Sequence, residues 1–234
     1  MADEEALWDL RHLAQARGLC DWMFEQFSAY ARGRTVEVGA GIGTFSERLL
    51  AHGVRELMLL EPEAVCVAQL CERFGSDPRV TVVDELLPEA PSLLAWEGTA
   101  DFVLCQNVLE HIAEESGAVQ AMADALAPGG VVTILVPAHP RLYGRLDERY
   151  GHERRYTRKR LARVIHRTGL ELVDLYSFNA LGIAGWLAKS FAGKPSVSRG
   201  SLRAYERMLP YWRAVEDRRS LPVGLSLVAH ARKR

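Results

Sequence analysis

A carboxylate followed by three alternating glycines is the clearest candidate for a binding site. Glu37 lies two residues before Gly39, and Gly41 and Gly43 follow. Glycine lets a ligand approach the backbone closely, and the helical pattern that follows would direct free N–H groups at that ligand. A dinucleotide fingerprint would have its third glycine at Thr44, and a phosphate loop would end in Gly-Lys-Ser/Thr. A carboxylate beside the turn repels phosphate and attracts ammonium, so the pattern favours a nucleoside ligand that carries an amino acid.

The glycine turn lies in a region where strand and helix patterns alternate. The order indicates a mainly parallel, doubly wound α/β sheet with helices on both faces. In such sheets ligands bind beyond the carboxyl ends of the strands. The predicted strands are 35–38, 56–60, 80–83, 102–105 and 131–136, and the predicted helices are about 44–52, 63–74 and 116–127.

Polar residues follow each of the other predicted strands. Glu61, before Pro62 and 18 positions beyond Gly43, is placed to accept hydrogen bonds from ribose hydroxyls. One carboxylate of the Asp84–Glu85 pair could accept a hydrogen bond from the adenine amino group. The fourth and fifth strands are followed by Gln106, Asn107, Glu110 and His111, and by His139 between two prolines. Five strand ends therefore deliver polar groups to one edge of the sheet.

Composition narrows the class of protein. The 234 residues suit one domain, and a formal net charge of −1 gives no global attraction to nucleic acid or to an anionic membrane. The four cysteines have no paired metal-ligand spacing, and three lie in apolar patterns, which predicts reduced core thiols and a cytoplasmic protein. The acidic start predicts no secretory signal, and no apolar run is long enough to insert stably in a bilayer.

Several segments together resemble class I S-adenosylmethionine-dependent methyltransferases. The similar segments are Val36–Gly43 and Leu59–Pro62 for the first two motifs, Phe102–Ile112 for the fourth-strand motif and Leu126–Pro137 for the turn into the fifth strand. Pro137–Gly144 and Gly151–Thr157 are similar to a bacterial branch that acts on small molecules. The same region resembles the quinone-biosynthesis O-methyltransferases, which place a histidine there.

The resemblance implies a fold and a line of cofactor contacts. The fold is a Rossmann-like seven-stranded sheet whose last strand, near 225–229, runs antiparallel. It divides the single domain into a helical cap (1–33), a core (34–177 and 221–231) and an acceptor-side insertion (178–220). The methionine end of S-adenosylmethionine would contact Glu37 and the turn of Gly39, Gly41 and Gly43, with Asn107 beside it. The ribose would contact Glu61 and Pro62, and the adenine would contact Asp84 or Glu85.

Methyl transfer is a displacement at an activated sulfonium carbon, so the protein mainly aligns the reactants and excludes water. A hydroxyl or ammonium acceptor also needs a base, and a histidine suits this task near neutral pH. The candidates are His111, His139 and His152. A Mg²⁺ site of Glu110, His111 and His152 or Glu153 is an alternative, but the spacing does not require it and no metal is predicted.

The acceptor contacts are predicted in two segments. Arg154 and Arg155 could bind an anionic small molecule, with Tyr143 and Tyr156 nearby, whereas the arginines after Thr157 read as the solvent face of a capped helix. Asn179, Trp186 and Tyr205 of the insertion could line the pocket. Two other interpretations of the insertion compete with this one. The insertion could contact a partner subunit in a homodimer, or it could touch a membrane.

Three functions remain open at this point. The first is methyl transfer to oxygen, nitrogen or carbon of a small molecule, in secondary metabolism or cell-envelope synthesis. The second is a nicotinamide-dependent oxidoreductase, which leaves Glu37 unexplained and fails at Thr44. The third is a non-catalytic regulatory protein that binds S-adenosylmethionine. A nucleic-acid substrate is disfavoured because neither a base-flipping motif nor a basic groove is evident.

Overall fold

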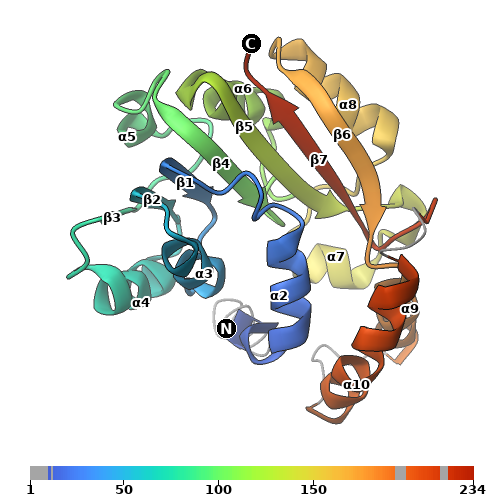
Figure 1. The fold of residues 1–234 in the computed structure, drawn as a ribbon. Coiled ribbons are helices and arrows are strands. Elements are labelled where there is room, and N and C mark those ends of the chain that lie inside the picture. The colour runs from blue at the N-terminus through green and yellow to red at the C-terminus, as the bar shows by residue number, and fades with distance from the viewer. Residues whose placement is uncertain (1–9, 12, 193–198, 217–220) are drawn as a thin grey trace.

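The protein forms a seven-stranded sheet in the order β3-β2-β1-β4-β5-β7-β6, with helices on both faces (Figure 1). The computed structural model describes residues 10–11, 13–192, 199–216 and 221–234. The strands are β1 (Arg34–Val38), β2 (Glu56–Leu60), β3 (Val80–Val83), β4 (Ala100–Gln106), β5 (Leu126–Pro137), β6 (Glu171–Phe178) and β7 (Ser226–Arg232). Strands β1 to β5 pair in parallel, and β7 runs antiparallel to both β5 and β6. The predicted fold class is confirmed.

The described helices are α2 (Arg17–Glu25), α3 (Thr44–His52), α4 (Ala64–Phe74), α5 (Pro91–Leu94), α6 (Glu115–Ala125), α7 (Arg145–Arg149), α8 (Arg158–Arg167), α9 (Ala180–Ala192) and α10 (Arg199–Glu216), with a short 3₁₀ turn at Pro140–Leu142. The limits of α3, α4 and α6 lie within two residues of the predicted ones. Thr157 caps α8 by accepting a hydrogen bond from the Arg160 N–H. The structure therefore contains the capped, arginine-rich helix that the sequence predicts after Thr157.

Alternate residues of each buried strand enter opposite cores, as the two-residue period of a strand requires. Val103 and Cys105 of β4 pack into the core under α5, α6 and α8. Phe102 and Leu104 pack into the other core, which α2, α3, α4 and α10 cover. Burial on both faces accounts for the near-continuous apolar strands in the sequence.

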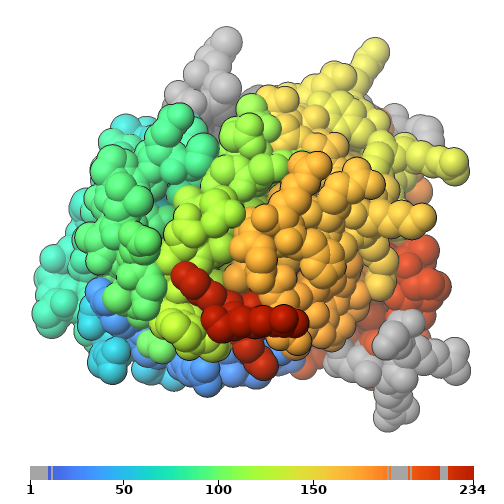
Figure 2. Space-filling model, turned by 90° about the horizontal axis from the view of Figure 1, so that it is seen from above, coloured from blue at the N-terminus to red at the C-terminus, as the bar shows by residue number. Residues whose placement is uncertain are grey.

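The carboxyl ends of β1 to β5 lie at one edge of the sheet because their parallel register aligns them. Val38 pairs with Leu60 on one side and Cys105 on the other, and Leu60 pairs with Val83. In Figure 1 these strands point downward, and α7 and α9 lie at that lower edge. Figure 2 shows the molecule from above, at the end opposite this edge, where the end of β7 lies between β5 and the α8–β6 region. Because ligands bind beyond the carboxyl ends of parallel strands, we expect the functional site at the edge that carries α7 and α9.

The segments expected to cover this edge contain helices. Residues 10, 11 and 13–15 and α2 precede β1, and a Cβ placed on Gly41 would lie 3.6 Å from Leu10. Helices α9 and α10 lie between β6 and β7, in the predicted insertion. Within the described residues, no helix is both long and apolar enough to cross a membrane. The cytoplasmic location and the homodimer stay predictions.

Gly39 is held in a conformation and a space that only glycine fits. Its φ is 70°, and a Cβ there would lie 2.2 Å from Val108 Cγ2, in the segment after β4. The first strand end and the fourth therefore touch at this point, which brings the glycine turn against the loop that follows β4.

We expect Gly39→Ala to lower the free energy of unfolding more than Gly169→Ala does. Gly169 has a φ of 76° and nothing near its missing Cβ, so that variant measures only the backbone cost of about 1–2 kcal/mol. Gly39→Ala adds the overlap with Val108, which should cost about 1–3 kcal/mol more. Urea unfolding of both variants gives the difference, and equal losses would contradict the close contact.

Candidate active site

The glycine turn buries its carboxylate beneath it. Glu37 is 4% exposed, and its Oε2 accepts a 2.6 Å hydrogen bond from Ser46 Oγ of α3. Burial, followed by the nearby charge of Glu61, raises the pKa of Glu37 to about 8, although the Ser46 bond opposes this. The carboxyl is therefore largely neutral at pH 7 without a ligand, and an ammonium group beside it would favour its ionised form.

The second strand end places a carboxylate across the same turn. Glu61 Oε2 accepts a 2.7 Å hydrogen bond from the Gly41 N–H, and its Oε1 accepts one of 3.0 Å from the Glu63 N–H. Burial raises the pKa of Glu61, partly offset by these two bonds. Glu61 thus lies on the glycine turn, and the adjacent Pro62 is exposed.

The third strand end separates the two neighbouring acids. Glu85 accepts hydrogen bonds from both the N–H and the hydroxyl of Ser92, which fastens it to the start of α5. Asp84 is exposed, and its charge is felt at Glu61. Asp84 is thus the acid that remains available to a ligand on this edge.

The segment after β4 turns sharply at Asn107. This residue is exposed, has a φ of 52°, and donates its N–H to the Leu135 carbonyl at 2.8 Å. Asparagine tolerates this left-handed conformation better than most residues. The turn carries Val108 over Gly39, so Asn107 lies between the glycine turn and the start of the acceptor side.

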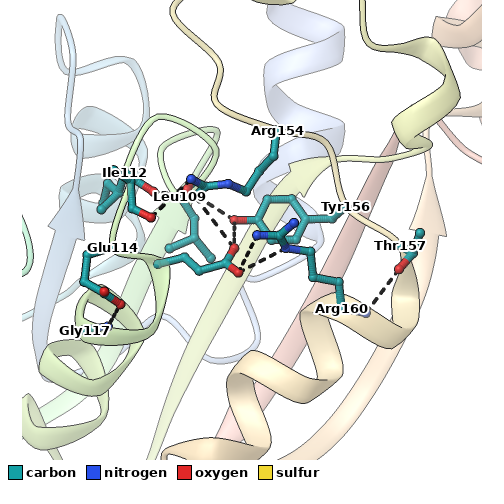
Figure 3. A network of polar contacts seen from close by, with 10 residues as sticks. Leu109, Ile112, Glu114, Gly117, Arg154, Tyr156, Thr157 and Arg160 are labelled. Carbon is teal, nitrogen blue, oxygen red and sulfur yellow. Dashed lines mark hydrogen bonds and ion pairs between the residues drawn. The ribbon is translucent and has the colours of Figure 1, made fainter.

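Residues 139–157, the histidine loop, include α7 and the short 3₁₀ turn and pack on the segment after β4. The Glu153 N–H donates to the Glu110 carbonyl at 2.8 Å, and Arg154 donates to the carbonyls of Ile112 and Ala113 (Figure 3). His139 also has a left-handed backbone, with a φ of 59°, and its N–H donates to Tyr156. Its Nε2 is buried without a hydrogen-bond partner among the described residues.

Arg155 and Tyr156 are parts of the protein core. The buried Arg155 donates Nε to Asp147 at 2.8 Å and a terminal nitrogen to the Ala138 carbonyl. Tyr156 is 0% exposed, and its hydroxyl donates to Glu115 at 2.7 Å (Figure 3). The predicted acceptor contacts of Arg154, Arg155 and Tyr156 stay predictions, and in the structure other protein groups bind the two guanidinium groups and the phenol.

A buried aspartate holds one of the candidate histidines. His152 Nδ1 lies 2.8 Å from Asp147 Oδ1, and the side chain of His152 is 12% exposed. Burial opposes ionisation of Asp147, but hydrogen bonds from His152 and Arg155 hold its pKa below the usual value. Tyr143 is half exposed and donates its hydroxyl to the His152 carbonyl. His152 is thus held at both its ring and its backbone.

His111 and Glu110 lie beside His152. The rings of His111 and His152 meet edge to face, with centroids 4.8 Å apart. Desolvation of the His111 ring, and then the nearby charge of His152, lower its pKa to about 4. Burial raises the pKa of Glu110 to about 8, and its Oε2 has no hydrogen-bond partner among the described residues. His111 is therefore neutral at pH 7, and Glu110 is largely protonated.

These three residues could hold a metal ion. Glu110, His111 and His152 offer ligand atoms that all lie within 4.8 Å of one another. The arrangement matches the alternative weighed from the sequence, with His152 and not Glu153 as the third member. A divalent cation there would require Glu110 to ionise.

The insertion reaches the same loop through one aromatic side chain. Trp186 of α9 stacks on Arg155, with the guanidinium carbon 4.3 Å from the ring centroid, and its indole N–H is buried without a hydrogen-bond partner among the described residues. Asn179 instead accepts hydrogen bonds from the Gly182 N–H and the Tyr205 hydroxyl. Its side-chain oxygen caps α9, so of these two only Trp186 adjoins the histidine loop.

A family model described as a methyltransferase domain matches residues 10–175. The chain belongs to this family. Its members are S-adenosylmethionine-dependent methyltransferases, so the predicted family and the predicted methyl donor are both confirmed.

Individual relatives of the methyltransferase match parts of it. Ubiquinone biosynthesis O-methyltransferases of Xanthomonas campestris pv. campestris and Xylella fastidiosa are 35% and 33% identical over 103 and 101 residues, which are 42% of this chain and 41% and 39% of those proteins. The matches thus span about two fifths of these relatives. A solved S-adenosylmethionine-dependent methyltransferase from Mesorhizobium loti shares the fold, with a TM-score of 0.60, 17% identity, and coverage of 86% of this chain and 90% of that one.

Two residues of the methyltransferase site were not foreseen in the sequence. Asp147 binds His152 and Arg155, and Glu115 accepts a hydrogen bond from Tyr156. In the sequence each is only one of thirty acidic residues. A signal was present only for Asp147: a carboxylate five residues before the candidate base, in a loop without helical periodicity.

We expect the free energy of unfolding of the methyltransferase to fall as pH rises from about 5 to 8, and Glu110→Gln to reduce that fall. Glu110 has a raised pKa of about 8 in the folded state, so folding binds a proton that is lost as pH rises through that value. The fall attributable to Glu110 should be roughly 3 kcal/mol. Glutamine stays neutral at every pH and removes it.

Urea unfolding at pH 5, 6, 7 and 8 measures this dependence. Glu153→Gln, which removes an exposed carboxyl from the same loop, should leave the slope unchanged. An unchanged slope in Glu110→Gln would show that this carboxyl is ionised in the folded protein at neutral pH.

Proposed function

We propose that this methyltransferase moves a methyl group from S-adenosylmethionine to a hydroxyl or amine of a small molecule, with His152 as the base. The supporting observation is that one sheet edge carries two kinds of group. Carboxylates and a glycine turn lie at the ends of β1 to β3. A histidine backed by an aspartate lies in residues 139–157, which follow β5 and pack on the segment after β4. Gly39 and Val108, which touch, join the two sides.

The donor side supports an ordered set of contacts. Glu37 and the Gly39–Gly43 turn would bind the methionine end, because an ammonium group beside Glu37 would favour its ionised form and the glycines let a ligand approach the backbone closely. Glu61 would exchange its bond to Gly41 for the ribose hydroxyls. Asp84 is favoured over Glu85 for adenine because Ser92 already occupies Glu85. Asn107 would border the methionine.

The acceptor side supports a nucleophile that carries a proton. A methyl group adds to an oxygen or nitrogen lone pair, and the proton of that atom must leave. His152 is favoured over His111 because only His152 has an aspartate on one ring nitrogen. The names of the curated relatives specify O-methyl transfer, which makes a hydroxyl the first acceptor to test. Because Arg154 and Arg155 are engaged elsewhere, they give no support for an anionic acceptor.

We expect Glu61→Ala to weaken binding of S-adenosylmethionine and S-adenosylhomocysteine by about tenfold or more. Loss of a carboxylate that holds two ribose hydroxyls should cost about 1.5–3 kcal/mol. Isothermal titration calorimetry measures both affinities. Glu63→Ala, two residues away and exposed, should bind normally. Normal binding by Glu61→Ala would reject the proposed ribose contact.

Turnover separates an enzyme from a non-catalytic binder. Transfer of a labelled methyl group from S-adenosylmethionine to a panel of phenols, catechols, and primary and secondary amines would give the acceptor class. Binding of the donor without transfer to any of these would favour the regulatory protein. Placement in secondary metabolism or cell-envelope synthesis remains a proposal that this panel narrows.

A further inference from the structure

Asp147 is a fully buried carboxylate that the sequence did not mark as functional. It lies on α7 at 0% exposure. Its Oδ1 is 2.8 Å from both His152 Nδ1 and Arg155 Nε, and its Oδ2 accepts the Gly144 N–H at 3.0 Å. Arg155 and the Gly144 N–H both donate to it, and Arg155 also brings a positive charge, so the site is built for an ionised carboxylate.

The ionised carboxylate determines which nitrogen of His152 carries the proton. A carboxylate only accepts hydrogen bonds, so Nδ1 of the facing ring must be the protonated nitrogen. The neutral ring then has its lone pair on Nε2. His152 is 12% exposed and lies against His111 and Glu110, on the side of the loop that meets the segment after β4.

Arg155 keeps this arrangement from depending on solvent. Its guanidinium neutralises Asp147 where burial would otherwise favour the protonated acid. Trp186 stacks on the same guanidinium group, and the Ala138 carbonyl accepts one of its hydrogen bonds. The histidine is therefore held through a contiguous series that runs from α9 to Arg155, Asp147 and His152.

We propose that Asp147 is a positioning residue for methyl transfer, which fixes the Nδ1–H tautomer of His152 and leaves Nε2 to take the proton of the acceptor. This inference rests on the proposed function. The acceptor oxygen or nitrogen forms a bond to the methyl carbon while the C–S bond breaks, and its electron pair stays on sulfur as S-adenosylhomocysteine. The acceptor proton passes to Nε2, and solvent later removes it from the imidazolium ion.

The tautomer can be measured without an acceptor. Long-range ¹H–¹⁵N correlation spectra of the histidine rings in the full chain distinguish Nδ1–H from Nε2–H, and His152→Gln identifies the signals of His152. We expect Nδ1–H in the wild type and loss of that preference in Asp147→Asn and Asp147→Ala. Glu148→Gln, an exposed carboxyl on the same helix, should keep the wild-type tautomer. An Nε2–H ring in the wild type would overturn the proposal even if every Asp147 variant failed to fold.

Kinetics with catechol as the acceptor test the consequence for transfer. Asp147→Asn should lower kcat by about 10²-fold or more, because it impairs general-base catalysis, while the affinity for S-adenosylmethionine changes less than about twofold. The loss should shrink as pH rises towards ionisation of the catechol, which then needs no base. An equal loss at all pH values, or wild-type activity that disappears in EDTA and returns with Mg²⁺, would overturn the role.

The two proposals can fail separately. If S-adenosylmethionine does not bind the wild type, the proposed function fails whatever the tautomer is. If it binds and methyl transfer proceeds normally in Asp147→Asn with an altered His152 tautomer, the positioning role alone fails.

Discussion

The buried ion pair between Arg155 and Asp147 is the interaction on which the acceptor side of this methyltransferase depends. Neither charge would be stable alone at its depth, because desolvation of a single charge costs several kcal/mol. Together they satisfy each other, and their remaining hydrogen-bonding capacity is used by His152, Gly144 and Ala138. A loop without helix or strand periodicity thereby acquires one conformation, which is what a base must have to act in a defined direction.

The donor side is ordered by a different constraint, the close approach of backbones at glycine. Gly39 leaves room for Val108, and Gly41 offers its N–H to Glu61. One segment links the two sides. The segment that begins at Asn107 packs against the glycine turn at one end, and at the other end its carbonyl groups accept hydrogen bonds from Glu153 and Arg154. A methyl group must pass between donor and acceptor within about 3–3.5 Å, so a single rigid segment between them is an effective way to hold both.

Much of the fold was predictable from sequence because its determinants are local. The predicted limits of β2 and β3 coincide with the observed ones, since a short apolar run between turn residues leaves little freedom. The donor groups follow from the same logic, because parallel strands bring their ends to one edge. Arg155 and Tyr156 were misread because their polarity suggested an exposed loop. Their partners lie 8 and 41 residues away, and no periodicity reveals such pairs.

The protonation of Glu110 decides between two incompatible uses of His152. Nε2 has one lone pair, which can accept a proton or coordinate a metal ion, and it cannot do both in the same step. A cation between Glu110, His111 and His152 would ionise Glu110, whereas burial without a cation raises its pKa to about 8. With Glu110 neutral and the pKa of His111 lowered, His152 is the one member of this cluster that has a carboxylate on a ring nitrogen. The same Asp147 contact would also orient a metal-binding imidazole, so the aspartate alone does not choose between the two. The choice lies with Glu110: as a neutral acid it leaves the lone pair of His152 to the acceptor proton.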